Sequence, residues 1–320
     1  MRSGFVSILG RPNAGKSTLL NALIGEKIAI VSNKPQTTRN RIQGIVNRPD
    51  AQIILIDTPG VHRPDSALGR QMMEEVAQAL EGVDVLVLML DASEDAGRAA
   101  EHAFQRARNF RGPKILLLNK VDRIAKPKLL PMIEKCSRLD KFAEIIPISA
   151  KTGSGCARLV DVIEKLLPEG QPLFPQDQVT DQPERFLAAE IVREKVIKNT
   201  YHEVPHAVAV IVERFEEKPG LLRIYAVIHV ERDAQKGILI GRGGEMMKKI
   251  GSEARRELEE ILGVKIYLEL AVKVQRNWRD DPARVAQLDW HRQLEDLSGT
   301  GPLGAPESAD PPEESEADEQ

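Results

Sequence analysis

The chain has 320 residues, of which 42% are hydrophobic, and a formal net charge of −3. At roughly 150 residues per domain, this length predicts two domains that each bury a core. Two cysteines, Cys136 and Cys156, provide no metal-ligand spacing and no disulfide framework, which favours the reducing cytoplasm. The longest apolar run, 83–90, is too short for a membrane helix of about 20 residues, and the N-terminus enters an apolar strand without a secretory leader. We therefore expect a cytoplasmic protein.

Residues 4–167 alternate between apolar runs and longer segments with helical spacing. Continuous apolar strands between helices indicate a buried, mostly parallel sheet flanked by helices. The expected strands are 5–9, 51–56, 83–90, 114–119 and 145–149, and the clearest helices are 66–80 and 155–167. Residues 168–183 contain four prolines and little periodicity, so we interpret them as a linker after a first domain at 1–167.

A second domain at 184–281 has a different order of elements. Its first helix follows Pro183, and two strands at 206–215 and 221–232 are joined by a turn at 218–220. The apolar run 237–240 is strand-like when taken alone. A charged helix at 244–262 and a third strand at 264–274 complete the domain.

Residues 282–320 form an acidic tail that we predict to be disordered, because it has almost nothing to bury. The last twenty residues contain seven Asp or Glu and no Lys or Arg, so removing them changes the net charge from −3 to +4. A solubilising tail is the simpler interpretation, and mimicry of nucleic acid is the alternative.

The first glycine-rich turn, GRPNAGKS at 10–17, lies between an expected strand and helix and matches G-x-x-x-x-G-K-[S/T]. Gly10 and Gly15 let backbone N–H groups surround a β-phosphate, Lys16 pairs with β- and γ-phosphate oxygens, and the Ser17 hydroxyl is a Mg²⁺ ligand. The expected nucleotide-binding residues here are Gly10, Arg11, Pro12, Asn13, Ala14, Gly15, Lys16, Ser17 and Thr18.

The apolar run 51–56 is followed by a carboxylate, which can help to order the ligands around Mg²⁺. Asp57 opens the motif DTPG, and Gly60 offers a backbone N–H to a γ-phosphate. This motif assigns Asp57, Thr58, Pro59, Gly60 and Val61 to the nucleotide site. A GTPase also needs a threonine that senses the γ-phosphate through Mg²⁺, and spacing alone does not choose between Thr37 and Thr38.

The motif NKVD at 119–122 decides the base. Asp122 can accept hydrogen bonds from N1–H and N2–H₂ of guanine, whereas adenine would leave the carboxylate unpaired. Asn119 holds the base near N7, the Lys120 stem lies over the ring, and Ala150 offers its N–H to guanine O6. These motifs predict GTP rather than ATP, and they assign to the guanine site Asn119, Lys120, Val121, Asp122, Ser149, Ala150 and Lys151.

A second glycine turn, Gly241-Arg242-Gly243-Gly244, is not another nucleotide loop. A phosphate loop would need G-K-[S/T] after its last glycine, and a dinucleotide fingerprint would need glycine where Met246 stands. The remaining G-x-x-G pattern is weak alone. The order helix, strand, strand, helix, G-x-x-G, helix, strand is that of a KH domain, whose glycine loop clamps about four nucleotides of single-stranded RNA.

The chemistry around this turn agrees with RNA binding. Glycines let a sugar-phosphate chain approach closely, and Arg255 extends the charge of the nearer cations. A solvated helix face is the simpler interpretation of the lysines, and core packing is as good an interpretation of Ile238, Leu239 and Ile240 as base contact. Trp278 could stack on a base or belong to a core. The predicted RNA-binding residues are Lys236, Ile240, Gly241, Arg242, Gly243, Gly244, Lys248 and Lys249.

Five motifs in this order, GRPNAGKSTLLN, PQTTRNRIQGI, DTPGVHRP, NKVD and PISAKTG, resemble the Era family of bacterial ribosome-associated GTPases over about residues 4–281. The resemblance implies a TrmE-Era-EngA-like P-loop GTPase domain followed by an α+β type II KH domain. It favours Thr38 beside Ser17 and Asp57 as magnesium ligands. It also implies a monomer that binds the 16S rRNA 3′ end and assists 30S maturation, with peripheral association with the cytoplasmic side of the membrane. The acidic tail departs from the family pattern.

One position bears on the rate of hydrolysis. Val61 follows DTPG where many small GTPases carry a water-orienting glutamine, so we expect a slow intrinsic rate. In related GTPases an asparagine placed like Asn13 helps to bind K⁺, and a merely loop-stabilising asparagine is the alternative. We assign catalysis to Lys16, Asn13, Thr38 and Gly60, with GTP/GDP, Mg²⁺ and K⁺ as cofactors.

Two other functions compete with this one. The first is a constitutive RNA-binding protein built on a non-hydrolysing GTPase scaffold, and the intact Lys16, Ser17, Asp57 and Asp122 argue against it. The second is a metabolic P-loop kinase, which would lack NKVD and would not need a KH domain.

Overall fold

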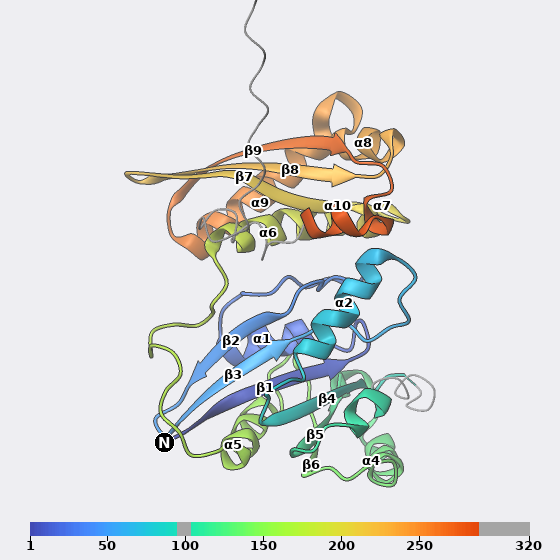
Figure 1. Cartoon of the computed structure of the whole chain (residues 1–320), viewed down its shortest axis with the longest axis vertical. Coiled ribbons are helices and arrows are strands. Elements are labelled where there is room, and N and C mark those ends of the chain that lie inside the picture. The colour runs from blue at the N-terminus through green and yellow to red at the C-terminus, as the bar shows by residue number, and fades with distance from the viewer. Residues whose placement is uncertain (95–103, 288–320) are drawn as a thin grey trace, which may run out of the picture.

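The computed structural model describes residues 1–94 and 104–287, which form two units of helices and sheet joined by an extended segment (Figure 1). Residues 95–103 and 288–320 lie outside this description. The prediction of disorder for most of the acidic tail therefore falls on residues that the structure does not describe.

The first unit is built on a six-stranded sheet with the order β2-β3-β1-β4-β5-β6. Its strands are β1 (Arg2–Gly10), β2 (Ile42–Asn47), β3 (Ala51–Asp57), β4 (Val85–Asp91), β5 (Lys114–Asn119) and β6 (Glu144–Pro147). All neighbouring pairs are parallel except β2 with β3. β3 is buried along its whole length, which explains its continuous apolar sequence. The mostly parallel sheet is confirmed. Strand β2 was not predicted, because its sequence IQGIVN has no continuous apolar run.

Helices cover both faces of this sheet (Figure 1). One face packs against α1 (Lys16–Ile24) and α5 (Cys156–Leu166). The other packs against α2 (Ala67–Gln78), a helical stretch at 104–108 and α4 (Leu129–Ser137). Two short 3₁₀ turns, η1 (Val121–Arg123) and η2 (Lys126–Lys128), precede α4. Since β1, β3, β5 and β6 run parallel, the loops that follow them meet at one edge of the sheet, where open α/β folds place their ligands.

The second unit has a three-stranded sheet, in which β7 and β8 are antiparallel and β8 and β9 are parallel. Its elements are α6 (Glu184–Asn199), α7 (Val204–Ala207), β7 (Ala209–Lys218), β8 (Leu221–Val230), α8 (Asp233–Ile240), η3 (Arg242–Gly244), α9 (Glu245–Leu262) and β9 (Lys265–Val274). Apolar side chains of α6, α8, α9 and the sheet form one core. This is the element order of a KH domain.

The run 237–240 is helical, as the KH element order requires, so the strand-like interpretation of the run taken alone is wrong. The Gln235 side chain caps the N-terminus of α8. Its Oε1 accepts hydrogen bonds from the N–H groups of Glu231 at 2.9 Å and Arg232 at 3.1 Å. Leu239 is buried while Ile238 and Ile240 are exposed. Only one of the three apolar side chains therefore enters the core.

The proline-rich segment 168–183 lies along the first sheet. The Ile45 N–H of β2 donates to the Val179 carbonyl at 2.8 Å. The Gln52 Oε1 of β3 accepts from the N–H groups of Leu173 at 2.7 Å and Phe174 at 2.9 Å. The segment is therefore fixed to the first unit before it reaches α6.

The end of the described chain packs between the units. Trp278 of η4 (Trp278–Asp280) is 1% exposed, its indole N–H donates to the Ala207 carbonyl at 2.9 Å, and it shares an apolar cluster with α2. It is a core residue rather than a platform for a base. Residues 282–287 form α10 (Pro282–Gln287) with Val285 buried in the same cluster, so disorder from residue 282 was wrong for these six positions.

Candidate nucleotide site and RNA groove

A cavity of about 740 Å³ opens at the carboxyl edge of the six-stranded sheet. The predicted residues that line it are Pro12, Asn13, Gly15, Lys16, Ser17, Thr18, Thr38, Gly60, Asn119, Lys120, Asp122, Ala150 and Lys151. The predicted residues that belong to the same loops without lining the cavity are Gly10, Arg11, Ala14, Asp57, Thr58, Pro59, Val61, Val121 and Ser149. The motifs, far apart in sequence, therefore meet around one space.

The phosphate loop is tightly packed and needs its glycines. Gly15 has φ 104°, and a Cβ there would lie 2.3 Å from the Asn119 amide nitrogen. A Cβ on Gly10 would lie 2.6 Å from the Met89 carbonyl oxygen. Lys16 Nζ donates to the carbonyls of Gly10 at 3.2 Å and Arg11 at 3.1 Å. Burial lowers the pKa of this amine, and the Asp57 carboxylate opposes the shift.

Three predicted magnesium ligands converge at the cavity, and two of them, Ser17 and Thr38, line it. The Ser17 hydroxyl donates to Asp57 Oδ2 at 2.6 Å, the Ser17 and Thr38 hydroxyl oxygens are 2.8 Å apart, and Thr38 Oγ1 donates to Asp57 Oδ2 at 3.4 Å. Thr37 does not join them, because its hydroxyl donates to the Lys34 carbonyl at 2.8 Å. The geometry therefore places Thr38, not Thr37, beside Ser17 and Asp57.

The donor set fits Mg²⁺, a hard cation that prefers oxygen ligands. The second carboxylate oxygen of Asp57 is buried without a hydrogen-bond partner. Burial raises the pKa of Asp57, although Lys16 and the hydroxyls of Ser17 and Thr38 oppose the shift. A divalent cation would supply the missing partner. In residues 1–94 and 104–287, no group of three or more His, Cys, Asp or Glu side chains gathers into another metal site.

Asn119 joins the base loops to the phosphate loop, as predicted. Its Nδ2 donates to the Ala14 carbonyl at 2.7 Å, and its Oδ1 accepts from the Ala150 N–H at 2.9 Å. The Ala150 N–H, which was expected to donate to guanine O6, therefore donates to Asn119 in this structure. Asp122 lies on the cavity wall, and a hydrogen bond from Ser149 lowers its pKa. The Ser149 hydrogen bond thus favours the charged form of this carboxylate at the cavity wall.

Two residues of the cavity wall, Asp91 and Asn33, were not predicted from the sequence. Asp91 Oδ2 lies 2.5 Å from Lys120 Nζ. An acidic residue at the end of β4, in register with Asn119 of β5, was the available signal. Asn33 accepts through its carbonyl from Asn13 Nδ2 at 3.1 Å and had no signal in the sequence. Val61 is buried in an apolar cluster and its N–H donates to the Gly10 carbonyl at 3.0 Å, so it offers no side chain to a water.

The second unit carries a groove of about 670 Å³ between the glycine turn, α9 and β9. The predicted residues Lys236, Ile240, Gly244 and Lys248 line it, as does Arg255. The predicted residues Gly241, Arg242, Gly243 and Lys249 belong to the adjoining turn and helix but are not part of the lining. Leu239 is in the core. The groove also has an apolar wall that was not predicted, formed by Met247, Leu268, Leu270 and Val272.

The glycine turn presents bare backbone. Gly241, Gly243 and Gly244 have φ values of 71°, 58° and 83°. A Cβ on Gly243 or Gly244 would meet nothing within 4 Å. Steric conflict with neighbouring atoms of the protein is therefore not the reason for glycine at these two positions. Glycines with positive φ angles beside open space suit the close approach of a ligand to the backbone.

Fold and sites together define a P-loop GTPase joined to a KH domain. A family model described as a 50S ribosome-binding GTPase matches residues 5–120, and a KH domain model matches residues 203–279. GTPase Era of Geotalea daltonii is 54% identical over 280 residues, which cover 87% of this chain and 94% of that protein. The chain belongs to the Era family of GTPases.

Two solved structures are similar over nearly their whole length. A single-residue variant of Aquifex aeolicus Era bound to GDP·AlF₄⁻ matches with a TM-score of 0.87 at 43% identity, over 91% of this chain and 99% of that one. Era in complex with MgGDPNP and nucleotides 1506–1542 of 16S ribosomal RNA matches with a TM-score of 0.87 at 44% identity and the same coverage. The predicted family and fold class are confirmed, and the protein is a GTPase that binds GTP and GDP. None of the helices in the described ranges is long and apolar enough to span a bilayer.

Proposed function

We propose that the protein is a slow GTP-hydrolysing switch whose KH domain binds the 3′ end of 16S rRNA and which assists maturation of the 30S subunit. One observation carries this proposal: a single chain combines the Ser17–Thr38–Asp57 cluster with a basic groove beside a bare glycine turn. A relative of the same fold holds MgGDPNP and 16S rRNA nucleotides in one complex.

In the nucleotide site, Ser17, Thr38 and Asp57 would hold Mg²⁺, which would neutralise charge on the phosphates. Lys16 would leave its backbone partners to pair with phosphate oxygens, and the Gly60 N–H would donate to the γ-phosphate. Since Val61 cannot orient a water, we expect slow hydrolysis. We further propose that Asn13 helps to bind K⁺. Its bond to Asn33 supports the alternative, an asparagine that only joins two loops.

In the RNA groove, Lys236, Lys248 and Arg255 would attract phosphates while Ile240 and the β9 side chains contact bases. Contacts of this kind make affinity fall with salt. We propose residues 1–167 as the GTPase domain, 168–183 as the linker and 184–281 as the KH domain. We also propose a cytoplasmic monomer that associates peripherally with the cytoplasmic face of the cell membrane.

Phosphate release from GTP and from ATP, with and without 30S subunits, tests the proposal. We expect slow release from GTP alone, faster release with 30S subunits, and little release from ATP. Absence of release from GTP in both conditions would favour the constitutive RNA-binding protein. Preferential turnover of ATP would favour the kinase.

A further inference from the structure

The loop that carries Thr38 is attached to the KH domain on both sides. Ile30, before the loop, is 1% exposed and belongs to the apolar core of the KH domain. Arg39, after the loop, donates to the carbonyls of Val208 at 2.6 Å and His206 at 3.1 Å. Several residues between them, from Val31 to Thr38, line the nucleotide cavity. One wall of the nucleotide site therefore rests on the other domain.

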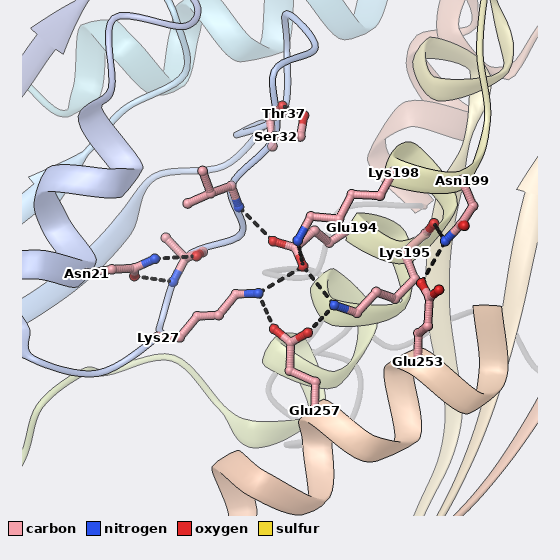
Figure 2. Close-up of polar contacts among 12 residues, drawn as sticks. Asn21, Lys27, Ser32, Thr37, Glu194, Lys195, Lys198, Asn199, Glu253 and Glu257 are labelled. Carbon is pink, nitrogen blue, oxygen red and sulfur yellow. Dashed lines mark hydrogen bonds and ion pairs between the residues drawn. The ribbon is translucent and has the colours of Figure 1, made fainter. Parts of the chain in front are cut away.

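Two consecutive residues of α6 hold this loop, which we call the switch loop (residues 31–38). Glu194 Oε1 accepts from the Val31 N–H at 2.9 Å (Figure 2). The Arg193 guanidinium donates to the Thr37 carbonyl. It is oriented by Glu190, whose two carboxylate oxygens each lie 2.6 Å from a guanidinium nitrogen. Arg193 is 2% exposed and Glu194 is fully buried, so both contacts are shielded from water.

The bond to Thr37 acts directly on Thr38. The Thr37 carbonyl and the Thr38 N–H belong to one planar peptide unit, so holding that oxygen restricts the backbone from which the Thr38 hydroxyl projects. Within the loop, the hydroxyls of Ser32 and Thr37 are 2.6 Å apart and Thr37 donates to the Lys34 carbonyl. These internal bonds make the loop a compact unit, and its two anchors set its orientation.

A cluster of charges keeps Glu194 in place (Figure 2). Its Oε2 lies 2.8 Å from Lys27 Nζ, 2.8 Å from Lys198 Nζ and 3.2 Å from Lys195 Nζ. Lys27 of the GTPase domain and Lys195 also pair with Glu257 of α9. Burial alone would raise the pKa of Glu194, but the hydrogen bonds from Lys198, Lys27 and the Val31 N–H lower it to about 2. The carboxylate is ionised at neutral pH and is a strong acceptor for Val31.

We propose that Arg193 and Glu194 are positioning residues for GTP hydrolysis, which hold the switch loop so that Thr38 faces Ser17 and Asp57. The inference rests on the proposed role of Thr38 as a magnesium ligand. GDP lacks the γ-phosphate that this threonine senses through Mg²⁺. The anchors therefore matter for turnover of GTP and much less for binding of GDP.

Substitutions in the full chain can distinguish the loss of a switch-loop anchor from a general loss of folding stability. Arg193→Met removes the donor to Thr37, Glu194→Leu removes the acceptor for Val31, and Glu194→Gln keeps an oxygen acceptor without the charge. The matched control is Glu253→Gln, because Glu253 accepts from Asn199 of α6 at 2.7 Å inside the KH domain. The measurements are kcat and KM for GTP, the Mg²⁺ concentration at half-maximal turnover, GDP affinity and melting temperature.

We expect Arg193→Met and Glu194→Leu to lower kcat about tenfold and to raise the Mg²⁺ requirement, with GDP affinity nearly unchanged. Glu194→Gln should retain more turnover than Glu194→Leu, and Glu253→Gln should match the parent. Parental kcat and Mg²⁺ dependence in both anchor variants would overturn the inference. If Arg193→Met unfolds, Arg193→Gln replaces it: a lower kcat with parental GDP affinity supports anchoring, whereas parental kcat, or loss of GDP affinity in step with kcat, overturns it.

Thr38→Ala distinguishes failure of this inference from failure of the proposed site. An unchanged Mg²⁺ requirement in Thr38→Ala would contradict the role of Thr38 itself. Reduced turnover in Thr38→Ala but not in Arg193→Met would contradict the anchor alone. If both act on one step, the double variant should be no slower than Thr38→Ala, because residues that act as a unit are not additive.

Discussion

The side chains of Lys120 and Asp91 form an ion pair, with 2.5 Å between Nζ and Oδ2. Lys120 has φ 64° at the start of η1, and Asp91 ends the neighbouring strand β4. The pair thus fixes the lysine whose stem is proposed to lie over the base.

Asp91→Asn should weaken GTP and GDP binding equally, by about 1.5 kcal/mol, because it removes a charge-assisted hydrogen bond on the base side of the site. Equilibrium titration with fluorescent GTP and GDP analogues measures both affinities. A loss for GTP alone would contradict this role, since the base is common to both nucleotides.

Asp122→Asn should exchange the base preference. An amide in place of the carboxylate loses one acceptor and gains a donor, so GTP affinity should fall by about 1.5–3 kcal/mol while xanthine nucleotides gain. Competition between GTP and XTP checks this result. Parental affinity for GTP in the folded variant would mean that Asp122 does not read guanine.

Residues whose roles are set by local spacing could be predicted from the sequence. Lys16 and Ser17 follow a fixed glycine pattern, and Asn119 stands in a short motif, so the contact of Asn119 with Ala14 was expected. Residues whose roles arise from contacts between the domains could not be predicted. Arg193 and Glu194 read as ordinary charges on a helix, and only the folded chain brings them to Thr37 and Val31.

Two local features of the fold also differ from their prediction because contacts distant in sequence, or a short pattern, determine them. The run 237–240 is too short for its period to separate helix from strand, and the cap that Gln235 forms at the start of α8 involves no residue of that run. Trp278 gave no local signal of its partner, the carbonyl of Ala207.

Potassium should accelerate hydrolysis if Asn13 helps to hold the ion. Replacing Na⁺ by K⁺ should raise GTP turnover, and Asn13→Ala should remove the difference while leaving GDP affinity largely intact. Phosphate release in the two salts measures the effect. Equal rates in both salts with Asn13 present would rule the mechanism out and leave Asn13 as the link to Asn33.

Glu194 should contribute a pH-dependent part of the stability. Its folded pKa, about 2, lies below the ordinary value of 4.5, so its contribution is complete above about pH 4.5 and is lost as the pH falls toward 2. The shift corresponds to at most about 3 kcal/mol. Urea unfolding between pH 3 and pH 6 should show a smaller pH slope for Glu194→Gln than for the parent. Identical slopes would mean that the ion cluster does not favour the charged form.

Arg242→Asp combined with Gly243→Asp should abolish binding to a single-stranded RNA that carries the 16S rRNA 3′-end sequence. Two carboxylates would face phosphates at close range, and a Cβ on Gly243 would obstruct the approach of the RNA backbone. Stability should change little, because both residues are exposed and that Cβ would meet nothing within 4 Å. Asp also tolerates the positive φ at Gly243 better than most residues do. Intrinsic GTP turnover should survive, since the turn lies outside the nucleotide cavity.

The matched control for this double variant is Gly263→Asp with Lys265→Asp, at the far end of α9. Gly263 has φ 66° and open space around a Cβ, and Lys265 is exposed. Both double variants therefore replace one cation and one glycine of positive φ by aspartate. RNA affinity, its salt dependence, melting temperature and GTP turnover should be measured together. Loss of RNA binding in both double variants would indicate nonspecific attraction by net charge, with affinity falling steeply with salt for any RNA. Loss at the glycine turn alone, with parental melting temperature and turnover, would locate the contact with the RNA backbone at Gly241–Gly244, and retained binding there would contradict it.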